Sequence, residues 1–464
     1  MVIKNNTFVK NIIYAFLSQA ISLCLSILTS LILPKFLGVT EYSYFQLFLF
    51  YAAYVGFILF GINDGIYLRL GGKKSNELDR ELLGGQLVLA MAIQFAIIFV
   101  IVIFIFCFAD NEIERTFILL SVLFYSVFQN ISGYIGYIFQ AINETKLFSK
   151  SILIEKVFFS IFLVLLLVFK IKRTYLYVVV YIVAKIIACA YCLCKGRHLI
   201  IINHLVWKDI FKEYKINVSV GINLMFANIA SMLILGIARQ FIDFRWGIES
   251  FGKFSFLLSI VNFFLLFIGQ VSMVLFPQLR LSSDTLQKKI YIRIRKYTLL
   301  FSPIVFITFY PIVQIIGIWL PKYADSLHYL IYLLPLCIFE TKTSLLSNTF
   351  FKVYRLERKI LFINIISFTI SLFFSVLGTL VFNSMEIIII GVVVSLGFRS
   401  IISELILSSY FDYHVIIYIA YDLFMICLFI VTSILFKGWQ GTIVFTIGYL
   451  ITLFIAKMYR KEIV

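Results

Sequence analysis

Long apolar stretches separated by short polar breaks run along the whole chain. Most are about 20 residues long, the length that an α-helix needs to cross a bilayer. Fourteen stretches can be distinguished: 11–33, 42–62, 83–108, 117–139, 150–169, 175–195, 217–237, 254–276, 298–318, 327–350, 360–382, 385–408, 415–435 and 441–457. They are continuously apolar rather than alternating, which indicates helices. The pattern predicts an all-α polytopic membrane protein with about 14 transmembrane helices.

Composition agrees with this class. Of the 464 residues, 62% are hydrophobic and 14% are charged, whereas soluble domains are close to half apolar and a quarter charged. The net charge of +17 would suggest nucleic acid in a soluble protein. Here most lysines and arginines lie in every second loop, beginning with the N-terminal segment, and the loop at Lys170, Lys172 and Arg173 is an exception. This bias predicts that both termini are cytoplasmic, and we expect no nucleic-acid partner.

The chain also contains traces of an internal repeat. Residues 38–45 and 247–254 align at an offset of 209, and residues 146–148 and 358–360 align at 212. Six helices per repeat would give both halves the same membrane orientation, as in parallel transporter repeats. We therefore expect two six-helix lobes that frame a central cleft. The predicted division is 1–195 for the first lobe, 196–216 for a basic cytosolic linker, 217–410 for the second lobe and 411–464 for an additional helix pair.

Five cationic side chains lie inside or at the edge of apolar stretches: Lys156, Lys185, Lys253, Lys342 and Arg399. A lysine or arginine at mid-bilayer costs about 2.5–3.5 kcal/mol on insertion scales, so a central one is expected to face a polar interior. Lys185 and Arg399 are the most central and are the first candidates for substrate binding, followed by Lys342. Lys156 and Lys253 lie near the ends of their stretches, where extension to the interface explains them equally well.

Acidic residues in the same stretches are candidates for binding a coupling proton or sodium ion. They are Asp64, Glu155, Glu340, Glu404 and Asp422. The alternative is that each of them pairs with a lysine or arginine of a neighbouring helix. Cys189, Cys192 and Cys194 lack the paired spacing of a metal site. We therefore expect no metal ion and no cofactor.

Several short motifs occur in order along the chain. They are Leu37-Gly38-Val39-Thr40-Glu41-Tyr42-Ser43-Tyr44-Phe45, Gly61-Ile62-Asn63-Asp64-Gly65, Gln140-Ala141-Ile142-Asn143-Glu144, Phe276-Pro277-Gln278-Leu279 and Ile318-Trp319-Leu320-Pro321-Lys322-Tyr323 with Leu334-Pro335. This series resembles the polysaccharide flippases of the multidrug/oligosaccharidyl-lipid/polysaccharide exporter superfamily, and the O-antigen (Wzx-type) branch in particular.

The resemblance implies a flippase of the bacterial inner membrane that moves an undecaprenyl-diphosphate-linked oligosaccharide, an O-antigen or related repeat unit, by alternating access. It also implies membrane lipids, a polysaccharide polymerase and a chain-length regulator as partners. An anionic diphosphate fits the cationic residues, since Lys and Arg are the usual phosphate partners.

Three alternatives remain. Lipid II flippases carry arginines in their first span, whereas residues 11–33 have no charge. A cation-coupled multidrug exporter would use membrane carboxylates, but the intramembrane balance here is basic. A polytopic enzyme of polysaccharide assembly would need a long catalytic outer loop or a membrane histidine. The chain offers neither, because its histidines, His198, His204, His328 and His414, fall in or near loops. We expect a transporter and not an enzyme.

Overall fold

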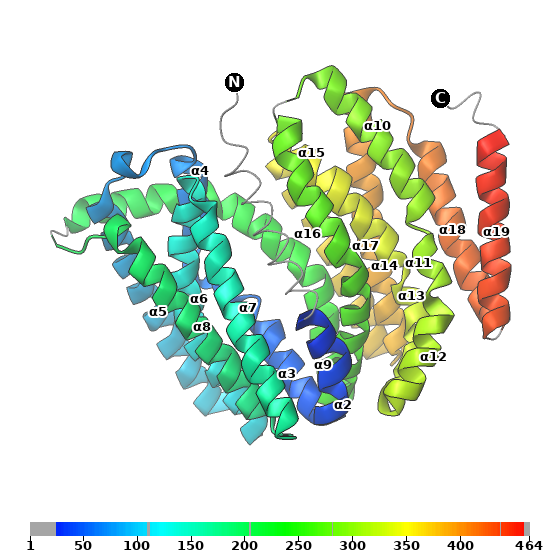
Figure 1. Ribbon diagram of the computed structural model, residues 1–464, viewed down its shortest axis with the longest axis horizontal. Coiled ribbons are helices and arrows are strands. Elements are labelled where there is room, and N and C mark those ends of the chain that lie inside the picture. The colour runs from blue at the N-terminus through cyan, green and yellow to red at the C-terminus, as the bar shows by residue number, and fades with distance from the viewer. Residues whose placement is uncertain (1–24, 109–111, 204–205, 281, 437, 459–464) are drawn as a thin grey trace. The chain divides into compact units, whose positions relative to one another are not determined.

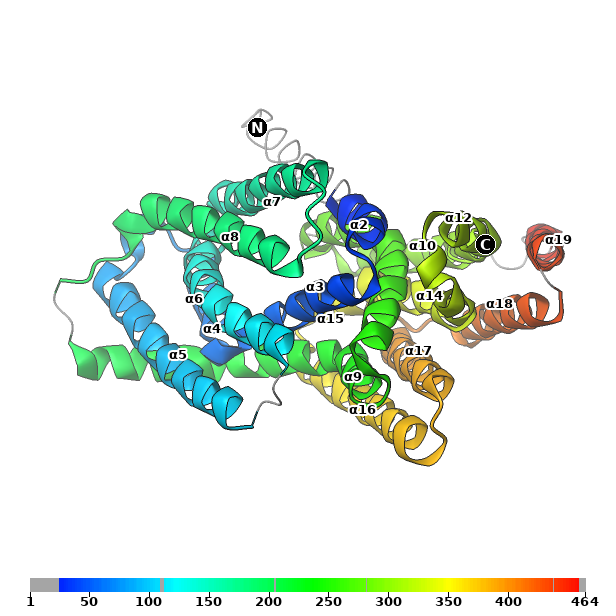
Figure 2. The same ribbon diagram turned by 90° about the horizontal axis from the view of Figure 1, so that it is seen from below.

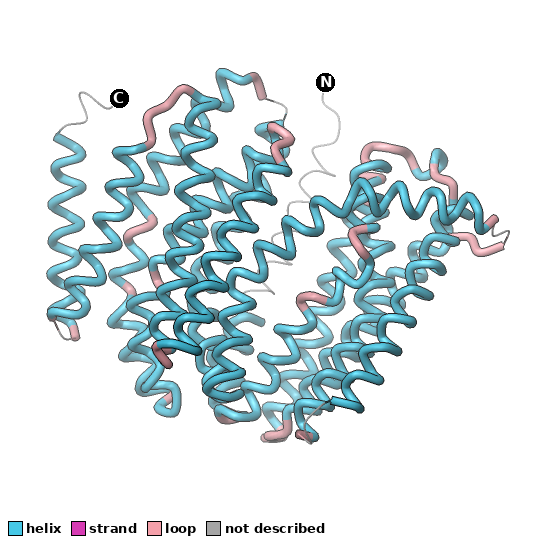
Figure 3. Tube along the Cα trace, turned by 180° about the vertical axis from the view of Figure 1, so that it is seen from behind, coloured by secondary structure: helices cyan, strands magenta, loops and turns pink. Residues whose placement is uncertain are grey.

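Helices form nearly all of the structure. The computed structural model describes residues 25–108, 112–203, 206–280, 282–436 and 438–458, and none of these residues is in a β-strand (Figures 1 and 3). The chain divides into two compact units, residues 1–229 and 230–464. The four-part division expected from the sequence stays a prediction.

The helices of the first unit follow one another with short connections. They are η1 (Leu28–Ile32), α2 (Leu33–Leu37), α3 (Val39–Ala52), η2 (Val55–Leu59), α4 (Ile62–Leu70), η3 (Ser75–Glu77), α5 (Arg80–Phe108), α6 (Ile113–Ala141), α7 (Thr145–Val168), α8 (Thr174–Gly196), η4 (Arg197–Leu199) and the start of α9 (Trp207–Arg280). Within this unit α7 and α8 lie side by side (Figure 2).

The second unit contains the rest of α9 and ten further α-helices. They are α10 (Asp284–Phe301), α11 (Ile304–Ile307), α12 (Phe309–Trp319), α13 (Leu330–Leu333), α14 (Pro335–Lys342), α15 (Asn348–Val353), α16 (Glu357–Val376), α17 (Met385–Phe411), α18 (Ile416–Leu435) and α19 (Trp439–Met458). The 3₁₀-helix η5 (Pro321–Tyr329) and the π-helices η6 (Thr343–Ser347) and η7 (Leu377–Val381) lie between them. Here α16 packs along α17, and α18 packs along α19 (Figure 2).

The helices have the length and composition of membrane spans. Ten helices in the described part of the chain qualify, or eleven when the bent pair Pro321–Leu333 and Pro335–Val353 is one span. One candidate, Trp207–Leu266, has 60 residues, about 90 Å of helix and far more than a bilayer is thick. It is interrupted at Gly247, whose φ of 78° and ψ of 178° are not helical, so it can hold two spans. The first expected span, 11–33, lies mostly outside the described residues, and the count of fourteen stays a prediction.

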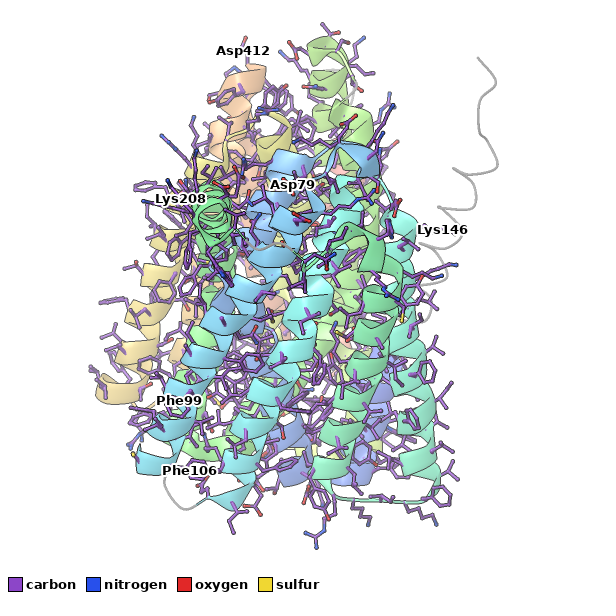
Figure 4. The ribbon with its side chains drawn as sticks, turned by 90° about the vertical axis from the view of Figure 1, so that its left-hand side faces the viewer. Asp79, Phe99, Phe106, Lys146, Lys208 and Asp412 are labelled. Atoms are coloured by element: carbon purple, nitrogen blue, oxygen red, sulfur yellow. The ribbon has the colours of Figure 1, made fainter. Side chains whose placement is uncertain are left out.

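Large apolar side chains cover the outside of the first unit. On α5 the exposed fraction is 67% for Phe99 and 71% for Phe106. Figure 4 shows both side chains away from the end of this unit where Asp79, Lys146 and Lys208 lie. A soluble protein rarely exposes so much contiguous apolar surface. The surface is that of a helix in contact with lipid.

The backbone supports the internal repeat. Gly38 and Gly247 have almost the same unusual conformation, with φ of 83° and 78° and ψ near 180°. Two further pairs of residues with positive φ stand at matching places: Asn143 and Arg355 precede α7 and α16, and Lys170 and Asn383 precede α8 and α17. The three pairs are 209, 212 and 213 residues apart. Left-handed conformations are uncommon outside glycine, so their recurrence at offsets that differ by at most four residues indicates two copies of the same helix and turn pattern.

Close helix packing fixes the start of α9 within the first unit. A Cβ atom on Gly65 would lie 1.9 Å from the carbonyl oxygen of Asn217, and one on Gly221 would lie 2.0 Å from that of Gly61. One turn further along α4, Arg69 donates to Asn217 at 2.6 Å. Gly61 and Gly65, four residues apart, thus contact Gly221 and Asn217, which are also four residues apart. Glycines spaced in this way allow two backbones to touch.

Candidate functional site

The first unit contains an ion pair at membrane depth. Lys185 on α8 donates to Glu155 on α7, and its Nζ lies 2.9 Å from Oε2. The side chain of Lys185 is 9% exposed and that of Glu155 is 17% exposed. One turn before the lysine, the Tyr181 ring packs 4.9 Å from Phe159 and 5.5 Å from Phe48, measured between centroids. An aromatic wall therefore adjoins the pair, and the carboxylate is its more accessible partner.

The second unit contains a comparable pair. Arg399 on α17 donates through one terminal nitrogen to Glu340 on α14 and through the other to the Ser231 hydroxyl on α9, the latter at 2.7 Å. The arginine side chain is 7% exposed and the glutamate 25%. The buried Nε of Arg399 has no hydrogen-bond partner among the described residues. The Nε–H of Arg399 is therefore a further hydrogen-bond donor that neither Glu340 nor Ser231 uses.

The two cations occupy related places in the repeat. Lys185 lies on α8 and Arg399 on α17, and these two helices follow the matched left-handed residues Lys170 and Asn383. Counted from that pair, Lys185 is 15 residues along and Arg399 is 16, so the two cations occupy neighbouring positions of the repeat. Each unit thus holds one cation on an equivalent helix, joined to a glutamate that is more exposed than the cation.

Four other charged residues form a closed cluster inside the second unit. Arg295 on α10 donates to Glu404 on α17 and, at 2.6 Å, to Asp422 on α18. Lys342 on α14 donates to the same two carboxylates, at 3.2 Å to Glu404 and 2.8 Å to Asp422. All four side chains are at most 2% exposed. We call these residues the buried tetrad.

The buried tetrad contains two positive and two negative groups, and each cation contacts both carboxylates. Its charges are therefore matched without any ligand. Buried ions are tolerated only when they are paired and hydrogen-bonded in this way. Lys342, Glu404 and Asp422, which the sequence suggested separately for substrate and ion binding, are here brought together with Arg295, and they tie four helices to one another.

Sequence reasoning missed Arg295 because it belongs to a strongly basic segment, 288–296, that has the composition of a cytosolic loop. The signal that could have found it is the spacing of the buried residues on α10. Gln287, Tyr291, Arg295 and Thr298 are buried and lie four, four and three residues apart. This is the spacing of one helix face.

The remaining candidates lie elsewhere. Lys156 is half-buried next to Glu155, and Asp64 is half-buried in the first turn of α4. Lys253 forms an ion pair with the exposed Asp325, at 2.5 Å, near one end of the second unit. The serines on the face of Arg399 are buried, and the Ser395 hydroxyl donates to the Gly391 carbonyl at 2.6 Å. In the described part of the chain no three His, Cys, Asp or Glu side chains are grouped as a metal site requires.

Comparisons with known proteins agree with this architecture. Residues 8–282 match the model of a family described as "Polysaccharide biosynthesis protein". Among solved structures, the lipid II flippase MurJ in an inward closed conformation is similar with a TM-score of 0.70 and 14% identity, over 97% of this chain and 99% of that one. An inward-facing multidrug resistance MATE family transporter of the MOP superfamily has a TM-score of 0.57 and 12% identity, over 88% and 96%. No curated protein matches this chain closely enough to count as a relative. At these identities the solved structures establish the fold, which is that of MurJ and the MATE transporters.

Proposed function

The chain belongs to the polysaccharide biosynthesis protein family, and from this premise we propose that it is a flippase for a saccharide carried on a lipid diphosphate. The substrate would be an undecaprenyl-diphosphate-linked oligosaccharide, an O-antigen or related repeat unit, moved across the bacterial inner membrane by alternating access. Both termini would be cytoplasmic, as the loop charges predict. The other expected partners are membrane lipids, a polysaccharide polymerase and a chain-length regulator.

The observation that carries this proposal is the presence of one exchangeable cation in each unit. A carboxylate neutralises Lys185 and another neutralises Arg399, and in both pairs the carboxylate is the more exposed member. A diphosphate is also an anionic oxygen acceptor and can take the place of the carboxylate on the cation. Contacts between ionised groups are about twice as strong as neutral hydrogen bonds. We infer that Glu155 and Glu340 hold the two cations in the unloaded transporter and give them up to the substrate.

This exchange gives the glutamates a role in release as well. When the substrate occupies the cation, the displaced carboxylate loses its positive partner and is free to accept a proton. A proton that leaves the glutamate then restores the ion pair and expels the diphosphate. Glu155 and Glu340 are therefore the proposed coupling groups, and the proton is the proposed coupling ion.

The buried tetrad is assigned a different role. Glu404 and Asp422 each contact two cations and are almost fully buried. The charges of the tetrad are therefore already matched, and a substrate cannot reach them. We assign the tetrad to holding α18 against α10, α14 and α17. Lys342 is accordingly removed from the proposed substrate contacts, and Lys156 and Lys253 are not needed for the exchange.

The charge pattern also weighs against a multidrug exporter. A cationic drug needs an unmatched carboxylate, but Glu155, Glu340, Glu404 and Asp422 all pair with Lys or Arg. The polytopic enzyme is not supported either, since the buried charged groups join to one another rather than around a reactive residue. The flippase hypothesis requires only that the more exposed carboxylates, Glu155 and Glu340, leave their cations when the substrate binds, and we retain it.

Deletion of the gene in its native host tests the proposal. A flippase predicts loss of the surface polysaccharide and accumulation of complete lipid-linked repeat units, restored by the wild-type gene. Plasmids that carry Lys185→Ala or Arg399→Ala should fail to restore export while reaching wild-type abundance in the membrane. Unchanged polysaccharide in the deletion strain contradicts the function, and truncated repeat units would indicate a transferase.

A further inference from the structure

A polar pocket at one end of the second unit contains the Lys253–Asp325 ion pair. Its volume is about 460 Å³, within the range of pockets that bind small molecules. It is formed by α9 next to Gly247, by η5 and by the connection between α16 and α17. Its lining includes Trp246, Lys253, Asp325, Tyr329, Asn383 and Glu386. All belong to loops or helix ends on the side that the loop charges predict to be outside.

The pocket presents several hydrogen-bonding groups close together. Lys253 Nζ lies 2.5 Å from Asp325 Oδ2, and the Asn383 side chain accepts a hydrogen bond from Arg245 Nε at 2.9 Å. Glu386 is exposed and makes no hydrogen bond or ion pair with any described residue. Its place in the first turn of α17 suits a negative charge. That position explains why residue 386 is acidic, but it does not explain the other polar side chains of the pocket.

Two aromatic side chains accompany these groups. Trp246 and Tyr329 line the pocket and are half-buried, so part of each ring system is accessible. Pockets for drug-like ligands are mostly apolar, whereas carboxylates, an amide and an ammonium surround this one. A saccharide matches the combination, because adjacent hydroxyls donate to a carboxylate or amide while the C–H face of the ring covers an aromatic ring. A diphosphate does not match, since the pocket has two carboxylates and Lys253 pairs with only one of them, so the other would repel the anion.

We propose that this pocket binds a sugar residue of the transported head group on the outer side of the membrane. The inference rests on the proposed function, and it adds the place where the saccharide end, rather than the diphosphate, is received. Trp246 and Tyr329 supply the stacking surfaces, and Asp325, Asn383 and Glu386 accept hydrogen bonds from hydroxyl groups. Lys253 holds Asp325 in position and donates to a ring or hydroxyl oxygen.

The test is saturation-transfer NMR with the full-length protein in lipid nanodiscs. The probes are free hexoses, N-acetylhexosamines, and the oligosaccharide released from the host's own surface polysaccharide. None of these carries a diphosphate or a lipid. We expect transfer to the sugar protons with the wild-type protein, and at least a fivefold weaker signal with Trp246→Ala and with Glu386→Gln. The matched controls are Trp439→Ala, an exposed tryptophan outside the pocket, and Glu114→Gln, an exposed glutamate in the first turn of α6. Both should retain the wild-type signal.

Equal signals from the pocket variants and the control variants, or no transfer from any probe, would contradict the proposal that this pocket binds a saccharide. Its failure can be told apart from failure of the proposed function. If no sugar binds but the deletion strain accumulates lipid-linked repeat units, the pocket is wrong and the flippase stands. If sugar binds through Trp246 and Glu386 but the deletion strain is unaffected, the pocket is a saccharide site of a protein that does not export this polysaccharide.

Discussion

At the scale of single residues, the charged groups of the membrane region are of two kinds. The pairs Lys185–Glu155 and Arg399–Glu340 each leave a partly exposed carboxylate. The tetrad around Arg295 is closed and neutral. We therefore expect different effects from substituting the same residue types in the pairs and in the tetrad. The number of oppositely charged groups that each residue contacts decides whether its substitution changes ligand binding or stability.

Removing a glutamate from an exchangeable pair should free its cation for an anionic ligand. We expect Glu340→Gln to raise the affinity of the purified protein for inorganic pyrophosphate about 10- to 100-fold, since a charged hydrogen bond is worth about 1.5–3 kcal/mol. Isothermal titration calorimetry measures the change. Glu114→Gln is the control, because it removes an exposed glutamate that lies outside both exchangeable pairs and the buried tetrad. Equal affinities for Glu340→Gln and wild type would contradict the exchange.

Breaking the buried tetrad should affect stability and not substrate binding. Lys342→Met leaves two carboxylates with a single cation, and loss of one partner from a buried ion pair costs about 3–5 kcal/mol. The charge-balanced double variant Lys342→Met/Glu404→Gln should recover most of that loss. Thermal unfolding in detergent follows both variants. A stable Lys342→Met protein that no longer binds pyrophosphate would place Lys342 at the substrate instead.

Sequence reasoning could find the membrane-depth cations but not their partners. A lysine in an apolar stretch is visible from composition alone, and so Lys185, Lys342 and Arg399 were recognised as unusual. Whether such a cation meets one carboxylate or two depends on which helices pack together, and Glu404 and Asp422 are distant from Lys342 in the sequence. Arg295 was hidden for the opposite reason, since its basic neighbours are exposed or half-buried and it alone is buried.

At the scale of helices, glycine spacing determines which elements can touch. Gly61 and Gly65 on α4 meet residues 217–221 on α9 with almost no space for a side chain. A larger residue must push these backbones apart.

Gly65→Ala should therefore destabilise the first unit, even though alanine favours helices by about 1 kcal/mol over glycine. The control is Gly317→Ala in α12, where the added methyl group would meet no atom within 4 Å; it should be neutral or slightly stabilising. Thermal unfolding of the two purified variants gives the comparison. If both variants unfold at the same temperature, the close approach of α4 and α9 is not tight.

Most helices were predictable from the sequence because each apolar stretch must satisfy its own backbone hydrogen bonds in the membrane. Breaks inside helices were harder to predict. Gly247 interrupts α9 by its backbone conformation, and a glycine in an apolar context gives no sign of that except through its repeat partner Gly38. The repeat itself was visible only as two weak matches, whereas the recurring left-handed residues make it plain.

At the scale of the whole molecule, the repeat places one exchangeable cation in each unit. The proposed function assigns each unit its own cation for the anionic head group. The charge-conserving variant Arg399→Lys tests how much geometry matters, since lysine cannot contact Ser231 and Glu340 through a planar fork. We expect export to fall but not vanish with Arg399→Lys, and to vanish with Arg399→Ala, as measured by surface polysaccharide in the complemented deletion strain. Equal export by the two variants would mean that the positive charge of Arg399 is not used.

A flipping measurement with the purified protein tests directly whether it moves the lipid-linked saccharide. Vesicles are loaded with the host's lipid-linked saccharide, and a glycosidase added outside reports the fraction of head groups in the outer leaflet. We predict that the wild-type protein raises the accessible fraction with time, and that Lys185→Ala/Arg399→Ala does so no faster than empty vesicles. An accessible fraction that stays constant with the wild-type protein, or that rises equally with the double variant, would contradict the account.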